Sequence, residues 1–277
     1  MSGNIQPGVS ESRVPCRRTL PLSGRAAPSC RPPRTILRAD ESDTATNLPV
    51  IAVVPRLKDG TTAIAQVLRE PLSPYAESLR RLSISLLHSV DWPESSRIVA
   101  VGSAIPEEGR STLAASLGRL LAGEGRRVLL IDCDWIHPEV HRLFHVPNET
   151  GLTSLLGDRR TMLDDAIRTD ALSGLDIVTA GRVRGPMIRG LASARMRSLL
   201  ATVAKSYELV LLDMPPVLMA HEVLLLSRMV DRIMFAVRWR YTRRKMVQDA
   251  IERILSAEGD MAGVVLTCVN AERYRKS

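Results

Sequence analysis

Apolar runs alternate with helix-like segments along most of the chain, and this alternation constrains the fold more than any other feature. The runs are apolar at most positions, which is typical of strands buried on both faces. They cover residues 97–102, 127–133, 175–179, 207–213, 231–237 and 262–269. Helical patterns precede or separate them at about 74–89, 111–124, 196–206, 221–229 and 242–257. The alternation predicts an α/β fold with a mostly parallel sheet covered by helices on both faces.

The N-terminal part of the chain lacks this alternation. Residues 1–48 are rich in Pro, Ser, Arg and Gly, and they show little apolar periodicity. Such a segment cannot bury enough surface to offset its ordering entropy, so we predict a disordered basic tail. We predict a linker over residues 49–73, in which 49–57 form a short apolar run, and a globular domain over 74–277.

Charge and cysteine content select no partner. The formal net charge of +8 includes basic clusters at 13–38 and 238–245, which suit an anionic membrane, an acidic polymer, nucleic acid or a merely solvated surface. None of the four cysteines forms a C-x-x-C pair, so we expect no zinc or redox motif. We expect a reducing, cytoplasmic setting instead. No stretch approaches 18 consecutive apolar residues, so we expect no transmembrane helix.

The segment GSAIPEEGRST, residues 102–112, lies between a predicted strand and a predicted helix. At such a junction, free backbone N–H groups and the positive end of the helix dipole can bind phosphate oxygens. Its GRST ending matches the glycine-lysine-serine/threonine pattern of a phosphate-binding loop, except that Arg110 replaces lysine. Ala104 stands where the first glycine of the pattern is usual. The context therefore favours a nucleotide phosphate site.

Three aspartates stand at the ends of two predicted strands. Asp132 and Asp134 follow the strand at 127–133, and Asp213 ends the strand at 207–213. The carboxyl ends of parallel strands lie beside the crevice where such sheets bind ligands, so we expect one pocket shared with the GRST turn. Mg²⁺ takes oxygen ligands, commonly carboxylates, a hydroxyl group and water. Ser111 with Asp132 or Asp213 would supply them.

The order of these motifs resembles the bacterial tyrosine autokinases of exopolysaccharide and capsule biosynthesis, of the polysaccharide co-polymerase type. It is similar, more distantly, to the partition and septum-site ATPases. The motifs that carry the resemblance are SAIPEEGRST (103–112), LLIDCDWIHP (129–138) and YELVLLDMPP (207–216). Segments 146–158, 191–200 and 263–270 add to it, so that it covers about residues 74–270.

The resemblance implies a P-loop NTPase fold, ATP and Mg²⁺ as cofactors, and phosphoryl transfer to tyrosine. The implied nucleotide-binding residues are Ala104, Gly109, Arg110, Ser111, Thr112 and Thr267. The implied metal ligands are Ser111, Asp132 and Asp213, the implied catalytic residues Asp132, Asp134 and Arg110, and the candidate phosphoacceptor Tyr274. The resemblance also implies a cytoplasmic domain held at the inner face of the membrane by a membrane-spanning chain-length protein, with homo-oligomers and without nucleic acid as a partner.

Several residues depart from the family pattern. The guanidinium of Arg110 keeps the charge of the usual lysine but is larger and planar, and a misplaced charge costs phosphoryl transfer about 100-fold or more. Glu107 replaces a glycine and adds negative charge beside the expected phosphates, next to Glu108. Thr267 replaces an asparagine in the segment that reads adenine, and Ser83 replaces the second arginine of the assembly motif.

These departures leave three functions open. The first is an ATP-binding autokinase-like regulator of exopolysaccharide polymerisation and export, with weak or lost activity. The second is a non-catalytic pseudokinase scaffold for a membrane chain-length protein. The third is a partition-type ATPase that binds DNA or membrane. The D-x-P-P motif at Asp213 favours the first two, and the lone tyrosine of the tail together with Arg110 favours the second over the first.

Overall fold

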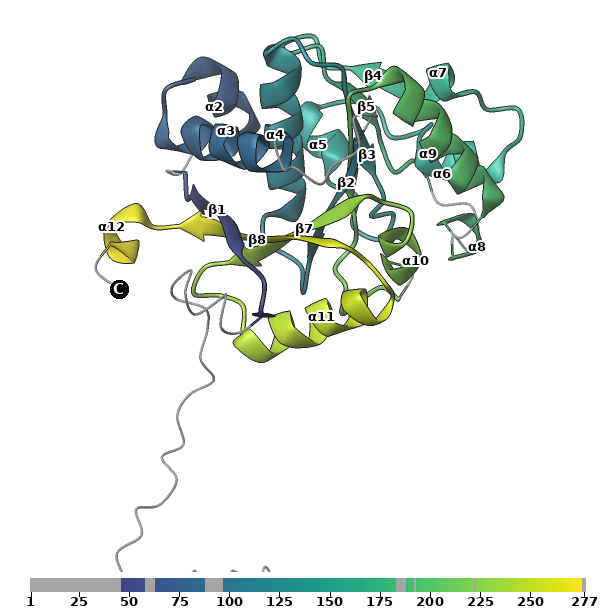
Figure 1. The fold of residues 1–277 in the computed structure, drawn as a ribbon. Helices are drawn as coiled ribbons and strands as arrows, with labels where there is room; N and C mark the ends of the chain where they lie inside the picture. Colours follow the sequence, from purple (N-terminus) through teal and green to yellow (C-terminus); the bar gives the residue numbers. More distant parts are fainter. Residues whose placement is uncertain are drawn as a thin grey trace, which may run out of the picture. The chain divides into compact units, whose positions relative to one another are not determined.

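A computed structural model describes residues 46–57, 63–87, 97–182, 188–191, 193–221 and 223–275 of the chain. Residues 1–45 of the tail predicted to be disordered (1–48) lie outside these ranges. The strands of the described part form one sheet in the order β1-β8-β7-β2-β6-β3-β5-β4 (Figure 1). They are β1 (Val50–Pro55), β2 (Arg97–Ser103), β3 (Val128–Asp132), β4 (Ile167–Thr169), β5 (Asp176–Val178), β6 (Leu209–Asp213), β7 (Arg232–Arg238) and β8 (Met261–Val269).

All strand pairs are parallel except β4 with β5, which is antiparallel. The mostly parallel sheet that the sequence predicts is therefore confirmed. The helices are α2 (Ala63–Arg69), α3 (Pro74–Leu87), α4 (Arg110–Gly123), α5 (Val140–Phe144), α6 (Leu152–Gly157), α7 (Leu163–Ala166), α8 (Ile188–Leu191), α9 (Ala194–Ser206), α10 (Val223–Ser227), α11 (Arg244–Ser256) and α12 (Ala271–Tyr274).

Two hydrophobic cores lie on the two faces of the sheet, because successive strand residues point to opposite faces. In β6, Val210 and Leu212 belong to the core that α9, α10 and α11 cover. Leu209 and Leu211 belong to the other core, which α2, α3, α4 and α5 cover (Figure 1). Burial on both faces explains why these strands are continuous apolar runs rather than alternating ones.

The range predicted to be a linker, 49–73, holds a strand and a helix. β1 pairs in parallel with β8, for example Val53 with Leu266, and adds an edge strand to the sheet. In the helix α2, Ile64 and Val67 are buried in the core that also includes residues of α4. The short apolar run was not enough to predict a strand, since its partner lies more than two hundred positions later in the chain. The sheet therefore draws on residues ahead of the predicted boundary at 74.

No helix in the described ranges is long and apolar enough to cross a membrane.

Candidate functional site

The structure brings the three aspartates and the GRST turn together at the carboxyl end of the sheet. The phosphate loop connects β2 to α4, and β6 lies between β2 and β3. Asp132 and Asp213 are paired in register across β3 and β6, which places their backbones side by side. Arg110 and Ser111 open α4 next to them, and Asp134 follows β3. All these residues are at most 7% exposed.

The side chain of Arg110 lies between two of the carboxylates. Its Nε donates to Oδ1 of Asp213 at 2.6 Å, and its Nη2 donates to Oδ2 of Asp134 at 2.8 Å. Nη2 is also 3.4 Å from Oγ of Ser111. Charge-assisted bonds of this length are among the stronger hydrogen bonds in proteins. The cation that the family pattern assigns to phosphate is thus bound by the carboxylates that the pattern assigns to metal and catalysis.

Backbone groups occupy most of the remaining carboxylate oxygens. The two oxygens of Asp132 accept the N–H groups of Asp134, at 3.0 Å, and Val140, at 3.2 Å. Oδ1 of Asp134 accepts the N–H groups of Ile136, at 3.2 Å, and His137, at 2.9 Å. These bonds shape the loop between β3 and α5. Two of the three predicted catalytic or metal-binding aspartates therefore also hold their own loop in place.

Asp213 is different, because its Oδ2 atom is buried and has no hydrogen-bond partner among the described residues. Burial raises the pKa of Asp213, although the charge of Arg110 and the hydroxyl of Ser111 oppose the rise. Burial, and then the charge of Asp213, raise the pKa of Asp132 well above its usual value. Burial opposes the charge on Arg110, but Asp213 and Asp134 outweigh it and raise its pKa. Three carboxyl groups thus face one arginine, and burial favours the protonated, uncharged form of Asp132 and Asp213.

The residues of this arrangement do not fit a resident Mg²⁺ ion. Mg²⁺ needs near-octahedral oxygen coordination, and Asp213 Oδ2 is the one carboxylate oxygen of the cluster that accepts no hydrogen bond from the described residues. Across the described ranges, no group of three His, Cys, Asp or Glu residues is arranged to hold a metal ion. Arg110 already supplies the positive charge that a metal ion would bring.

The cavity at the phosphate loop is small. It measures about 50 Å³ and lies between residues 106–111 of the loop and Asp134, His137 and Glu139 of the loop after β3. With Arg110 in this position, its guanidinium lines the pocket and leaves little free space at the phosphate loop.

The backbone of the loop does not match one departure from the family pattern, the replacement of glycine by Glu107. Glu107 has a φ of 64°, in the left-handed region that a glycine adopts without strain. Gly109 also has a positive φ, of 78°. The loop therefore keeps a conformation suited to glycine at position 107, although the residue there has a side chain.

Glu108 has a role that the sequence did not suggest. We expected its charge to lie beside the phosphates, but the side chain is 1% exposed and accepts the N–H of Ile105 at 2.8 Å and the hydroxyl of Thr242 at 2.5 Å. Burial raises its pKa to about 7. Glu108 ties the phosphate loop to the segment between β7 and α11. In the sequence, only the polar residue Thr242 could have indicated this role. It could not be linked to Glu108 before the structure showed that the two segments are in contact.

The remaining predicted site residues lie around this core. Thr267, on β8, donates its hydroxyl to the carbonyl oxygen of Glu108 at 2.6 Å, so it supports the backbone of the phosphate loop. Ala104 is buried in the loop, and Thr112 is half-buried in α4. Tyr274 lies on α12, where its ring packs edge-on against Trp239 with 6.3 Å between ring centroids. The nucleotide-binding and phosphoacceptor roles of these residues stay predictions.

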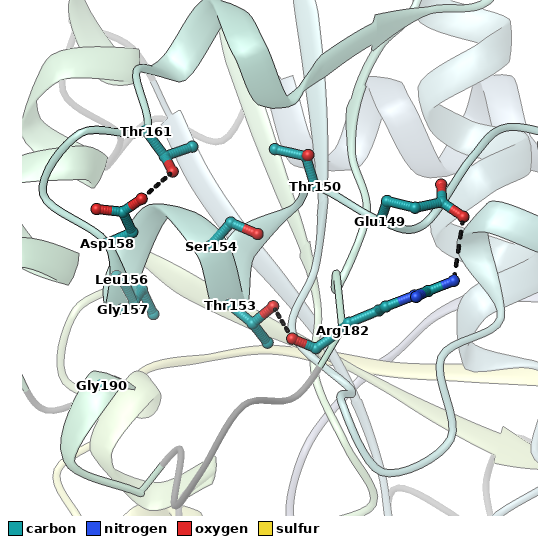
Figure 2. Close-up of a pocket in the computed structure, with 10 residues that line it drawn as sticks. All are labelled: Glu149, Thr150, Thr153, Ser154, Leu156, Gly157, Asp158, Thr161, Arg182 and Gly190. Carbon is teal, nitrogen blue, oxygen red and sulfur yellow. Dashed lines mark hydrogen bonds and ion pairs between the residues drawn. The ribbon is translucent and has the colours of Figure 1, made fainter.

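A second cavity, of about 460 Å³, lies around α6, outside the phosphate loop (Figure 2). Thr153 donates its hydroxyl to the carbonyl oxygen of Arg182 at 2.8 Å, and the guanidinium of Arg182 lies 3.5 Å from the carboxylate of Glu149 (Figure 2). Both charged side chains are well exposed. The sequence did not predict this cavity, most of whose lining comes from residues 149–158, a segment noted only for its resemblance.

Comparison with known proteins places the chain in a family, although no family model matches it. Tyrosine-protein kinase YwqD of Bacillus subtilis is 30% identical over 198 residues, which cover 71% of this chain and 82% of that protein. Tyrosine-protein kinase Etk of Escherichia coli is 29% identical over 199 residues, 72% of this chain. The putative tyrosine-protein kinase EpsB of Ralstonia solanacearum is 28% identical over 207 residues, 75% of this chain. The chain spans 27% of the length of Etk and of EpsB.

Solved structures agree. The kinase domain of E. coli tyrosine kinase ETK has a TM-score of 0.77 at 26% identity, covering 84% of this chain and 95% of that one. The BceF tyrosine kinase domain has a TM-score of 0.71 at 30% identity, covering 84% and 98%. The cell division ATPase MinD of Pyrococcus furiosus, at 18% identity and a TM-score of 0.53, shares the fold alone. The match to YwqD and the fit to these kinase domains show that the chain belongs to the bacterial tyrosine kinase family, as its motifs indicated.

Proposed function

We propose that this chain is a regulatory member of its family that takes part in exopolysaccharide polymerisation and export, with phosphoryl transfer from ATP weak or lost. The observation that carries the proposal is the position of Arg110, whose guanidinium fills the phosphate-loop pocket and binds Asp134 and Asp213. The protein would then act through its surface, as a scaffold, and not through catalysis.

The energetics of the pocket support weak nucleotide binding. ATP can enter only if Arg110 leaves two carboxylates that are 1% and 0% exposed. Breaking a buried ion pair costs about 3–5 kcal/mol, and each 1.4 kcal/mol weakens affinity about tenfold. Even if new contacts between Arg110 and phosphate offset half of that cost, ATP affinity would fall at least about tenfold below that of a lysine-containing loop.

The relatives support the setting. The succinoglycan biosynthesis transport protein ExoP of Rhizobium meliloti is 29% identical over 204 residues, which cover 26% of it. This chain matches only a part of that protein. The partner that we propose is a membrane-spanning chain-length protein. We place the chain at the inner face of the cell membrane through that partner, and we expect it to form homo-oligomers there.

The test is calorimetric titration of the chain with ATP and Mg²⁺, followed by mass spectrometry for phosphotyrosine after incubation. We expect no binding at micromolar ATP and no modified tyrosine. Arg110→Lys combined with Glu107→Gly should bind ATP at least about tenfold more tightly, because the lysine is shorter and the loop loses a negative charge. Arg240→Lys, an exposed arginine changed in the same way, is the matched control and should change nothing. Micromolar affinity in the unmodified chain, with phosphate on Tyr274, would overturn the proposal.

A further inference from the structure

We propose that the turn between β7 and α11 binds anionic phospholipid head groups, so that this chain touches the membrane surface directly. The side chains that would do so are Arg240, Arg243, Arg244 and Lys245, which we call the basic turn. Arg244 is half-buried and the other three are exposed. The inference rests on the proposed function only for its membrane setting, and it adds a lipid contact that needs neither the protein partner nor ATP.

The charges of the basic turn are not balanced by the protein itself. Within the described ranges, none of its four side chains forms an ion pair. The preceding Arg238 differs, because its Nη1 lies 3.8 Å from the carboxylate of Glu107. Neighbouring cations without acidic partners repel one another and create a local positive potential that attracts anions.

The placement of these cations on α11 is also unfavourable for the helix. Arg243 is the N-cap residue and makes no capping hydrogen bond with its side chain, and the first turn, which includes Arg244 and Lys245, contains no acidic residue. The N-terminus is the positive end of the helix dipole, where cations are destabilising. A local rule that is broken without a structural gain is expected at a functional site. We therefore attribute the basic turn to an anionic partner outside the chain.

Buried neighbours hold the turn in one conformation. Trp239 is 7% exposed, its ring packs edge-on against Tyr274 of α12, and the guanidinium of Arg240 lies 4.8 Å from its ring centre. Thr242 is 0% exposed and donates its hydroxyl to Glu108 of the phosphate loop at 2.5 Å. The cations are thus presented on an ordered backbone, which reduces the entropy that binding would cost.

The surroundings favour a membrane surface over nucleic acid. Asp249 and Glu252 follow Lys245 at helical spacing on the same face of α11, so a duplex lying along the helix would meet carboxylates. The ring of Tyr241 is 45% exposed, but the guanidinium of Arg238 lies 4.6 Å from its centre and covers one face, which leaves less of it for a stacked base. Tyrosine is common at the head-group level of bilayers. A lipid surface can contact the positive end of the helix without reaching its carboxylates.

The experiment is co-sedimentation of the full chain, without nucleotide, with vesicles of phosphatidylcholine alone or mixed with phosphatidylglycerol. The unmodified chain should bind the anionic vesicles, and raised salt should weaken the binding. Each Arg or Lys near an anionic surface contributes about fivefold to affinity. The triple variant Arg240→Gln, Arg243→Gln and Lys245→Gln should therefore bind roughly 100-fold more weakly.

A second triple variant is the matched control. Arg159→Gln, Arg160→Gln and Lys205→Gln remove the same charge from exposed positions between α6 and α7 and near the end of α9. Its affinity for anionic vesicles should stay within about threefold of that of the unmodified chain, because charges beyond a Debye length from the lipid are screened. The basic residues at 13–38 are present in all three proteins, so the difference between the variants reports the basic turn alone.

The inference is overturned if the two triple variants bind anionic vesicles equally, or if the unmodified chain binds neutral vesicles as tightly as anionic ones. It is also overturned if a DNA duplex binds the unmodified chain more tightly than the vesicles do and is lost in the first triple variant, since nucleic acid would then be the partner. If the first triple variant has a lowered Tm, Arg243→Gln with Lys245→Gln replaces it, because Arg240 then keeps its contact with Trp239, and a roughly 25-fold loss is expected.

The two proposals fail separately. Failure of vesicle binding would leave the ATP titrations unaffected, because the vesicle assay contains no nucleotide. Conversely, phosphotyrosine formation by the unmodified chain would overturn the proposed function without changing the comparison between the two triple variants.

Discussion

Arg110 and Arg119 lie on the same helix, α4, and both guanidiniums are buried against aspartate. Arg119 binds a single partner, Asp170, through two parallel hydrogen bonds of 2.9 and 2.8 Å. Its Nη1 donates to the carbonyl oxygen of Ile64 at 3.0 Å, and its guanidinium lies 4.8 Å from the ring centre of Phe144. Arg110 instead divides its donors between two aspartates.

The two arginines of this helix therefore differ in how well their charges are balanced. Around Arg119 each charge has its partner: burial alone would raise the pKa of Asp170, but hydrogen bonds from Arg119 and Ser173 lower it. Around Arg110 the acids outnumber the base, and burial raises the pKa of Asp132 and Asp213. We call the first set the Arg119 clamp (Arg119, Asp170 and Ile64). An ion pair whose charges are balanced holds two elements together, whereas a cluster with more acidic than basic groups is suited to binding a ligand.

The largest effect should come from breaking the clamp. Arg119→Ala leaves the carboxylate of Asp170 buried and unpaired by arginine, which typically costs about 3–5 kcal/mol of unfolding free energy. It also removes the contact with α2 through Ile64. Urea denaturation followed by circular dichroism measures the loss.

A double variant sharpens the test of the clamp. Arg119→Met with Asp170→Leu replaces the pair by apolar side chains, and it should recover most of the lost stability, because buried ion pairs contribute little over a well-packed apolar pair. A loss below about 1 kcal/mol for Arg119→Ala would contradict the distinction between the two arginines.

The clamp also shows the limit of what the sequence could predict. The positions of Asp132, Asp134 and Asp213 at one edge followed from apolar runs that end in aspartate, because the rules for parallel sheets are independent of detail. Arg119 gave no such signal, since an arginine within a helix is ordinarily exposed, and its partner is 51 positions away. Side-chain pairing across the fold needs the packed structure.

Other differences between expectation and structure have the same origin. β1 became predictable only with β8 beside it. The short helices α5, α6 and α7 have too few turns to show a helical period. At the site, the sequence suggested which residues meet but not that Arg110 would turn toward the carboxylates, because that depends on a balance of burial and charge. The sequence pattern located the pocket, but only the structure showed that the side chain of Arg110 lies in it.

The second prediction concerns pH, which should act on the two regions in opposite directions. Glu108, beside Arg110, has its pKa raised from 4.5 to about 7, so the folded protein holds a proton there that the unfolded chain has released. Ionisation of Glu108 therefore does not lower the unfolding free energy of the protein below about pH 4.5. As the pH rises to 7 and above, it lowers that free energy by about 3 kcal/mol. Asp170, whose pKa is lowered, contributes stability that is lost as the pH falls to acid values.

Urea denaturation at a series of pH values from 3 to 8 measures both effects. Glu108→Gln cannot ionise and can still bond Ile105 and Thr242, so its stability should fall less between pH 5 and 8 than that of the unmodified chain. The remaining fall comes from Asp132 and Asp213, whose pKa values are also raised. Asp170→Asn should reduce the loss at acid pH instead. If Glu108→Gln and the unmodified chain share the same slope between pH 5 and 8, the assignment of that slope to Glu108 is wrong.

The third prediction concerns strain, which the phosphate loop carries at Glu107. Its φ of 64° is costly for a residue with a Cβ atom and relaxed for glycine. Glu107→Gly should therefore raise the unfolding free energy by about 0.5–1 kcal/mol, after the greater freedom of glycine in the unfolded chain is subtracted. Glu258→Gly, also at positive φ (60°) but far along the chain, is the matched control and should gain similarly. A loss in Glu107→Gly would mean that its contacts with Arg238 and Tyr241 outweigh the strain.

The smallest effect should come from the opposite end of α4, where the C-cap residue Glu124 pairs with Arg80 of α3 at 3.0 Å. The two side chains are 42% and 30% exposed, so water competes for both charges and the pair should contribute only about 0.2–1 kcal/mol. Glu124→Gln should show a loss of that size at low salt, and the loss should shrink at 0.5 M NaCl because salt screens exposed charges. The loss caused by Arg119→Ala should persist at the same salt concentration, since Arg119 and its partner Asp170 are buried and salt screens buried charges much less. If both losses shrank equally, burial would not be what separates the interior of α4 from its end, and the contrast between the clamp and an ordinary surface pair would fail.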